Sequence, residues 1–264
     1  MLRALIAALR GAPGYLWSGW GSLASLLLFV ALWEIGAALY GPLILPDPRA
    51  TFTLLAGWWG GHTLWQELAI TARRALAGLA LAIGVGSALG LLAGLSMTAS
   101  MMARPWVTLL LGMPPIAWLV LAMLWFGASD GTPVFTVFVA CLPVVFVGAL
   151  QGTRTLDKPL RDMAHAFRLP WRMRMTDVYL PHVIAWLFPA WITALGSSWK
   201  VAVMAELLAS SDGVGAALAV TRVQLDTTAT LAWIAAVVGS LLALEYGLLE
   251  PLKRALERWR EAGG

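Results

Sequence analysis

Long apolar blocks are the feature that most constrains how this chain folds. The hydrophobic residues gather in stretches of about 18 or more with few charges, which is the helix length that crosses a bilayer. Because 60% of the 264 residues are hydrophobic and only 12% are charged, one soluble core cannot bury them all. The sequence therefore predicts an all-α membrane protein.

We expect about six membrane-spanning helices within a transmembrane domain at residues 21–252. Their approximate bounds are 21–40, 75–95, 105–126, 133–152, 182–205 and 230–249. Residues 1–20 place apolar side chains at helical spacing beside Arg3 and Arg10, which favours a helix on the membrane surface over a signal peptide. Residues 253–264 form a polar tail.

The distribution of Lys and Arg predicts the orientation. Of the 18 basic residues, 13 fall on one side if both termini are cytoplasmic, and the other five lie outside or within the spans. This bias places the polar loop 153–181, between the fourth and fifth spans, in the cytoplasm. We expect a multi-pass protein of a bacterial inner membrane.

The sequence lacks the residues that several classes of protein need for their function. Cys141 is the single cysteine, so no intrachain disulfide forms, and no Cys/His spacing suits a metal. The sequence holds no Ser/His/Asp set, no Walker phosphate loop and no dinucleotide-binding glycine motif. We expect no catalytic residue, no cofactor in this chain and no nucleic-acid partner.

Two spans carry helix-packing signals. Gly86, Gly90 and Gly94 form a doubled G-x-x-x-G, which is either a close helix interface or the ordinary glycine content of a membrane helix. Pro114 and Pro115 remove backbone donors from the third span and predict a bend or break. A bent helix can line a translocation pathway, although tolerated kinks are also common.

The loop 153–181 has the pattern of two short helices. Asp157 is a candidate cap, Pro159 suits a first turn and Pro170 ends the first helix. A second helical stretch, about 171–179, leads into the fifth span. The apolar stripe of the first helix comprises Leu160, Met163, Ala164 and Phe167. The loop is either a docking site for a soluble partner or a basic segment on anionic lipid headgroups.

This loop resembles the cytoplasmic loop of ABC importer permeases, whose pattern is E-A-A, three residues, G, nine residues, I-x-L-P. With Val178-Tyr179-Leu180-Pro181 on I-x-L-P, Asp162-Met163-Ala164 falls on E-A-A and Arg168 on the glycine, without gaps. The departures are Asp for Glu, Met for Ala, Arg for Gly and Val for Ile.

The resemblance extends over roughly residues 30 to 250. LILPDPRATFTLL is similar to the segment after the first span in the nitrate/sulfonate/taurine branch of these permeases. The second span, RPWVTLLLGMPPIAWLVLAMLWFG in the third, and SSWKVAVMAELLASSDGVG at the end of the fifth also look like that branch.

The resemblance implies a transporter built from two permease subunits, two cytoplasmic ATPase subunits that bind ATP and Mg, and an external substrate-binding protein. ATP closure of the ATPases would switch the membrane subunits between inward- and outward-facing states. We expect this chain to pair with a second copy of itself in the lipid bilayer.

The resemblance also assigns coupling roles within the loop. It places Arg168 where a glycine gives a tight turn; if Arg168 is helical, the turn moves to Leu169-Pro170. Leu180 and Pro181 would connect the docking surface to the fifth span. The residues expected to couple to the ATPase are Asp162, Met163, Ala164, Phe167, Arg168, Val178, Leu180 and Pro181.

Lys200 and Glu206 are ionisable residues in or near the fifth span, where charges are costly and usually functional or paired. Lys200 attracts an anionic substrate, or pairs with a carboxylate such as Glu34 or Glu245 or one of a partner subunit. Alternatively, Lys200 is a buried structural residue and Glu206 lies at the outer edge. The candidate pathway residues are Pro114, Pro115, Lys200 and Glu206.

Two other classes of protein remain as alternatives. A secondary transporter or channel would need its own ion-coupling site, and a membrane enzyme would need clustered His, Asp and Glu. The branch that the chain resembles imports nitrate, bicarbonate, sulfonates, taurine and other small polar solutes. Lys200 favours an anion among them.

Overall fold

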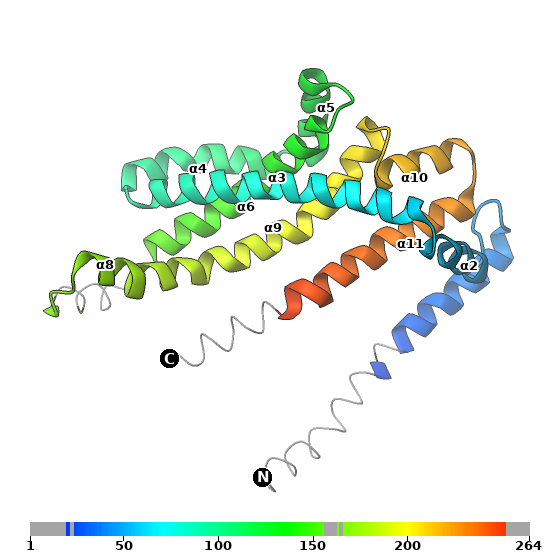
Figure 1. Ribbon diagram of the computed structural model, residues 1–264, viewed down its shortest axis with the longest axis horizontal. Helices are drawn as coiled ribbons and strands as arrows, with labels where there is room; N and C mark the ends of the chain where they lie inside the picture. Colours follow the sequence, from blue (N-terminus) through cyan, green and yellow to red (C-terminus); the bar gives the residue numbers. More distant parts are fainter. Residues whose placement is uncertain (1–19, 22–23, 156–162, 164–165, 252–264) are drawn as a thin grey trace, which may run out of the picture.

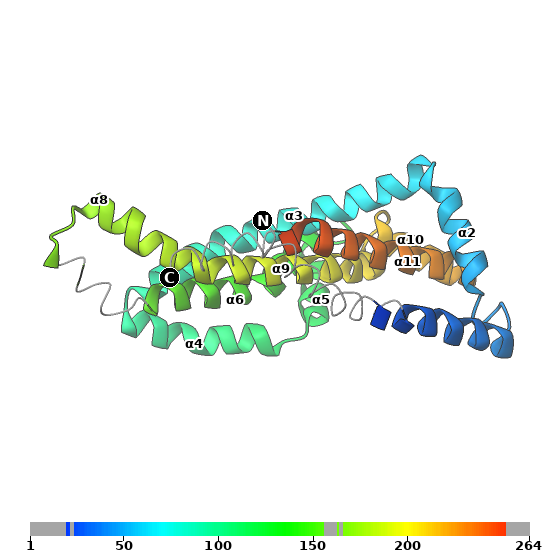
Figure 2. The same ribbon diagram turned by 90° about the horizontal axis from the view of Figure 1, so that it is seen from below.

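The computed structural model describes residues 20–21, 24–155, 163 and 166–251, and this part of the chain is helical. The helices α3, α4, α6, α9 and α11 run roughly along the long axis of the molecule, with α8 and the start of α4 at one end and α2 and α10 at the other (Figures 1 and 2). Their bounds are Ala24–Tyr40, α2 Pro48–Trp59, α3 His62–Gly94, α4 Met97–Gly112, α5 Pro115–Phe126, α6 Gly131–Arg154, α8 Trp171–Met173, η1 Arg174–Tyr179, α9 Leu180–Ala209, α10 Val214–Val223, α11 Thr227–Leu244 and η2 Glu245–Leu249.

The helix lengths and hydropathy confirm the membrane architecture. Among the described residues, four continuous helical stretches can cross a bilayer, namely 62–94, 131–154, 171–209 and 227–247, and α4 with α5 makes a fifth span if the bent pair counts as one. The apolar helix Ala24–Tyr40 lies where the first span was predicted, although its described part is shorter than the other spans. Each of the six predicted spans thus corresponds to an apolar helix or helix pair.

Close packing of α3 against α6 forms the centre of the bundle. A Cβ atom at Gly90 would lie 2.5 Å from the Phe146 carbonyl oxygen and 2.6 Å from the Ala149 Cβ. Gly86 and Gly94 meet Val145 and Thr153 of α6 in the same way. The structure therefore decides between the two interpretations of the glycine repeat, because it is a specific helix–helix interface.

The buried core joins α3, α6 and α9. Cys141 lies on α6 in this core, is fully buried, and its thiol hydrogen-bonds the Ala194 carbonyl of α9 at 3.4 Å. Interiors of this kind are close-packed, so small residues on α3 and α9 set how near the helices approach. The core cluster comprises Ala75, Leu79, Ala82, Val137, Cys141, Val145, Ala194, Trp199, Val201 and Ala202.

Pro114 and Pro115 break the third span, as predicted. The helix α4 ends at Gly112, Met113 and Pro114 are extended, and α5 begins at Pro115 with its axis bent by 92° from that of α4. Pro115 occupies the first turn of α5, where a missing N–H costs no helical hydrogen bond. The break is therefore a local consequence of the Pro-Pro pair.

Two helices outside the spans were not predicted. The connection after the first span contains α2, which Asp47 caps by accepting a hydrogen bond from the Ala50 N–H and which begins with Pro48. The segment before the last span contains α10. The second span also begins earlier than expected, at His62 instead of residue 75, and Glu67 on its early turns accepts a hydrogen bond from the Gly213 N–H.

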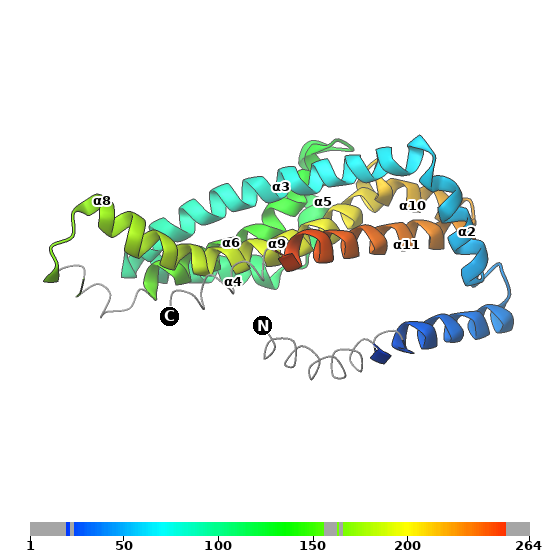
Figure 3. The same ribbon diagram turned by 60° about the horizontal axis from the view of Figure 1, so that its bottom comes forward.

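Helix Ala24–Tyr40 lies apart from the bundle of α3, α6, α9 and α11 (Figures 1 and 3). Its contacts with the rest of the chain include that of Trp33, whose indole N–H donates to the Pro46 carbonyl at 2.8 Å and whose ring packs 5.9 Å from that of Phe52. Its other large apolar side chains, from Leu26 to Leu39, are mostly exposed on the single chain. Lipid or another protein surface is needed to cover them.

Candidate functional site

The segment that was predicted to couple to an ATPase is a turn followed by one long continuous helical stretch. The Phe167 N–H donates to the Met163 carbonyl at 3.0 Å, which closes a helical turn before Arg168. From Trp171 the chain runs through α8, the π-helical η1 and α9 to Ala209 as a continuous helical stretch of 39 residues. The predicted second helix and its direct connection to the fifth span are confirmed.

Arg168 takes the backbone conformation of the glycine whose place it occupies. Its φ is 47°, in the left-handed region that L-residues with a side chain rarely adopt. Arg168 therefore lies in the turn itself, and the turn does not move to Leu169 and Pro170. Leu169 packs instead on Val178, as does Tyr179, and this contact holds the turn against the long helical stretch.

This segment exposes several large apolar side chains. Phe167 is 75% exposed, and exposed apolar side chains that lie together mark a surface for another molecule. Val178 is buried, Leu180 begins α9 and Pro181 lies in its first turn. Asp162 and Ala164 lie outside the described residues. The exposed apolar side chains are those of Met163, Phe167, Trp171, Met173 and Leu180.

A second site, towards the opposite end of the bundle, is a network of ion pairs centred on Arg74. Its guanidinium donates to Asp130 before α6, to Glu206 on α9 at 3.0 Å, and to Asp212 at 2.5 Å. The main-chain carbonyl of Asp212 accepts a further hydrogen bond at 2.8 Å. One arginine thus ties α3 to the segments beside α6, α9 and α10.

Glu206 is fully buried beneath this arginine. One carboxylate oxygen pairs with Arg74, and the other accepts hydrogen bonds from the Thr71 hydroxyl at 2.7 Å and the Gly215 N–H at 3.2 Å. Gly213, with φ 94°, lies against the same carboxyl group, where a Cβ would come within 2.5 Å. The Gly-rich turn is therefore required by the close approach of the main chain to Glu206.

Asp130 is the exposed member of the network. Hydrogen bonds from Arg74, aided by the charges of Arg74 and Arg73, hold the pKa of the Asp130 carboxyl below its ordinary value against a smaller opposing effect of burial. Arg73 pairs with the second oxygen of the same carboxylate. Asp130 is therefore an ionised link between α3 and the start of α6 at neutral pH.

Lys200 and Glu206 do not form one site. Lys200 is exposed on the single chain, and within the described residues no carboxylate lies at ion-pair distance from its ammonium group. Lys200 is therefore not buried on the single chain, whereas Glu206 lies three residues before the end of α9, near the edge of the fifth span. The substrate and partner-subunit interpretations of Lys200 remain. A role for Glu206, Pro114 or Pro115 in the pathway stays a prediction.

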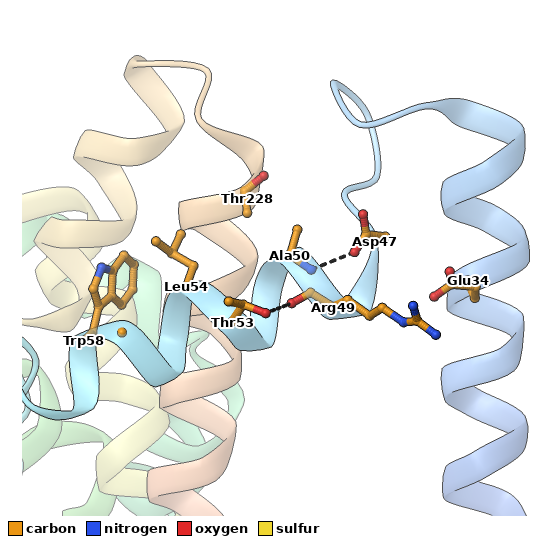
Figure 4. A pocket seen from close by; sticks show the side chains of 9 residues that line it. Glu34, Asp47, Arg49, Ala50, Thr53, Leu54, Trp58 and Thr228 are labelled. Atoms are coloured by element: carbon orange, nitrogen blue, oxygen red, sulfur yellow. Dashed lines mark hydrogen bonds between the residues drawn. The ribbon is translucent and has the colours of Figure 1, made fainter.

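Glu34, one predicted partner of Lys200, instead lines an open pocket of about 1000 Å³ between helix Ala24–Tyr40 and α2. The Arg49 side chain extends toward Glu34 across this pocket (Figure 4). Asp47, Trp58 and Thr228 complete its polar and aromatic lining.

Sequence comparison agrees with this architecture. Residues 86–258 match the family described as the binding-protein-dependent transport system inner membrane component. The chain is 30% identical to the putative aliphatic sulfonates transport permease protein SsuC of Bacillus subtilis, over 97% of this chain and 93% of that protein. It is 29% identical to the taurine transport system permease protein TauC of Escherichia coli, over 90% and 89%. It is 26% identical to the bicarbonate transport system permease protein CmpB of Synechococcus elongatus, over 71% of each.

An all-helical membrane bundle with this family match defines a permease, the membrane-spanning component of a transporter. The chain belongs to the binding-protein-dependent inner membrane component family, and it is an ABC importer permease of the nitrate/sulfonate/taurine type.

The Arg74 network was the part of the site that sequence analysis missed. Asp130 and Asp212 lie 56 and 138 residues from Arg74, and no local pattern links them. The usable signal was topological. An arginine pair near the start of the second span and carboxylates at the C-terminal ends of the third and fifth spans all fall on the same side of the membrane.

Proposed function

We propose that a separate ATPase subunit, which binds ATP and Mg, docks on the exposed apolar side chains of segment 163–180 and drives this permease. Two ATPase copies and two copies of this chain would form the transporter. The observation that carries the proposal is that the exposed Trp171, Met173 and Leu180 lie on one continuous helical stretch with α9. A displacement of the docked ATPase is then transmitted to the membrane bundle.

The proposed orientation has both termini and segment 153–181 in the cytoplasm. It is supported by the excess of Lys and Arg on that side. The Arg74 network then lies toward the external side, where an external substrate-binding protein delivers the solute. ATP hydrolysis takes place on the ATPase subunit and not on this chain.

The substrate that we propose is a small anion or zwitterion, such as a sulfonate, taurine, nitrate or bicarbonate. The relatives whose names carry sulfonates, taurine and bicarbonate support this class. Lys200 is exposed without a carboxylate at ion-pair distance among the described residues, which suits a passing anion. Lys200→Met is expected to reduce turnover, and unchanged affinity and turnover would remove Lys200 from this role.

The test of the coupling proposal is Phe167→Asp, with Phe167→Leu as the matched control. Phe167 is exposed, so neither change disturbs the core of the chain. In proteoliposomes with ATPase and binding protein, the Asp variant is expected to lose at least tenfold in ATP-driven uptake, because it places a charge in an apolar contact. The Leu variant is expected to retain uptake. Normal substrate-stimulated uptake by Phe167→Asp would refute the docking role.

A further inference from the structure

A cavity of about 410 Å³ lies between α4 and α6 and reaches Arg154, at the end of α6 that leads into the coupling loop. Its size falls in the range of ligand sites in proteins. One face of α4 and one face of α6 line it. The lining residues are Ser100, Arg104, Val107 and Thr108 on α4, and Phe146, Val147, Leu150, Gln151 and Arg154 on α6.

The cavity carries two positive charges and its lining holds no acidic residue. Arg154 donates to the Ser100 hydroxyl at 2.6 Å and to the Met97 sulfur, which is a weak acceptor. Within the described part of the chain, no ion pair involves Arg104 or Arg154. Two guanidinium groups that share one cavity repel each other unless an anion lies between them.

The charged lining residues lie at one end of the cavity and most apolar ones farther along it; the polar exception, Thr108, donates its hydroxyl to the Arg104 carbonyl of its own helix. On α4, Ser100 and Arg104 precede Val107; on α6, which runs the other way, Arg154 and Gln151 follow the apolar residues. Both helices therefore place their charged groups at one end and their apolar groups deeper in the bilayer. A soluble anion requires only the charged end, whereas a lipid matches both ends.

The outer surface of α4 fits a position at the membrane boundary. Met101, Met102 and Trp106 are all exposed beside the cavity, and tryptophan is typical of the level of the lipid headgroups. In the orientation proposed above, this end of the bundle faces the cytoplasmic leaflet. Basic pockets between helices at that level attract anionic headgroups.

We propose that the cavity between α4 and α6 binds an anionic phospholipid, with its phosphate between Arg104 and Arg154 and its first methylene groups on Val107 and Phe146. The proposal rests on the proposed orientation. The bound lipid would neutralise the two arginines and hold α4 to the end of α6, directly before the coupling loop.

Native mass spectrometry of the delipidated transporter, titrated with phosphatidylglycerol or phosphatidylcholine, tests the site. Arg104→Gln/Arg154→Gln is expected to weaken phosphatidylglycerol binding roughly thirtyfold, at about fivefold for each arginine. Arg104→Gln alone, which removes a side chain on the exposed surface, is expected to weaken it about fivefold. The matched control is Arg49→Gln/Arg222→Gln, which removes two exposed charges elsewhere and is expected to bind like the wild type.

Inorganic phosphate distinguishes a lipid from a soluble anion. Competition by phosphate at concentrations near those of phosphatidylglycerol would overturn the lipid assignment in favour of a free oxyanion. Equal phosphatidylglycerol binding by the double variant and the wild type would overturn the site. If the double variant loses the second permease copy while its phosphatidylglycerol binding is unchanged, the lipid site is overturned too, because the two arginines would then pair with a carboxylate of the second copy. The same spectra count the bound ATPase, so a missing ATPase refutes the proposed function and leaves the lipid result readable.

Discussion

Replacing Gly90 by alanine is expected to force α3 away from α6, because the added methyl group has no space. Its carbon would lie 2.5 Å from a carbonyl oxygen, 2.6 Å from the Ala149 Cβ and 3.2 Å from the Leu150 nitrogen. Carbon atoms in contact prefer about 3.5–4.0 Å, so the helices must separate by roughly 1 Å. Two of the three atoms belong to the main chain and cannot rotate away.

Gly84→Ala is the matched control on the same helix. A Cβ at Gly84 meets nothing within 4 Å, and both substitutions make the same gain in helix propensity, about 1 kcal/mol. Overpacking of a filled interior costs about 1–3 kcal/mol. The two variants are therefore expected to differ by about 2 kcal/mol in the free energy of opening the bundle, which is roughly a thirtyfold difference in the population of open molecules.

Cys141 provides the assay. It is the single cysteine of the chain, is fully buried beside α9, and reacts with a maleimide only when the bundle opens. In detergent, with fast reclosing, Gly90→Ala is expected to react about thirtyfold faster than Gly84→Ala. Equal labelling rates for the two variants would refute the claim that the glycine repeat sets the distance between α3 and α6.

Three further outcomes follow from the described geometry. Glu206→Ala is expected to destabilise the bundle by about 3–5 kcal/mol because it breaks a buried ion pair, and Glu206→Gln by less because an amide keeps the hydrogen bond to Thr71. Cys141 labelling measures the stability of both variants, and equal losses of stability would contradict this account. The pKa of Asp130 is lower in the folded chain than in the unfolded chain, so its contribution to stability is complete above its ordinary pKa and is lost as the pH falls through the lowered folded value. The stability of Asp130→Asn is therefore expected to change less with falling pH than that of the wild type, and parallel curves of stability against pH would contradict the link to Arg74. Arg168→Gly is expected to stabilise the turn by about 1 kcal/mol and Arg168→Val to weaken it, because only glycine adopts a φ of 47° without strain. Limited proteolysis between residues 163 and 170 is expected to slow in the glycine variant and accelerate in the valine variant, and the reverse order would disprove the strain.

Local signals in the sequence predicted those features that local physics decides. The Pro114-Pro115 pair removes two backbone donors from any helix that contains it, so these two adjacent residues alone predict the break in the third span. The spacing of Gly86, Gly90 and Gly94 puts them on one face of a helix, but the identity of the facing helix was beyond the sequence. The structure supplied α6 as the partner.

Long-range pairings could not be predicted in this way. The sequence listed Glu206 with Lys200 only as an ionisable residue of the fifth span, whereas the fold pairs Glu206 with Arg74, 132 residues away. An arginine at the start of a span looks like an interfacial anchor until the carboxylates of other loops are known. The turn at Arg168 was predictable only as a choice between two positions, since a cationic side chain in a left-handed conformation has no favourable local signal.

The continuous stretch from Trp171 to Ala209 also fixes the number of residues in the fifth span. It is roughly 58 Å long, and both ends are held, by the packing of Val178 at one end and by Arg74 on Glu206 at the other. Inserting one residue into α9 would turn Glu206 by about 100° away from Arg74, and inserting seven would nearly restore the angle but shift Glu206 by about 10 Å along the axis. Insertions and deletions are therefore excluded from this span. In a thicker or thinner bilayer, the bundle adjusts by tilting and not by changing the length of α9.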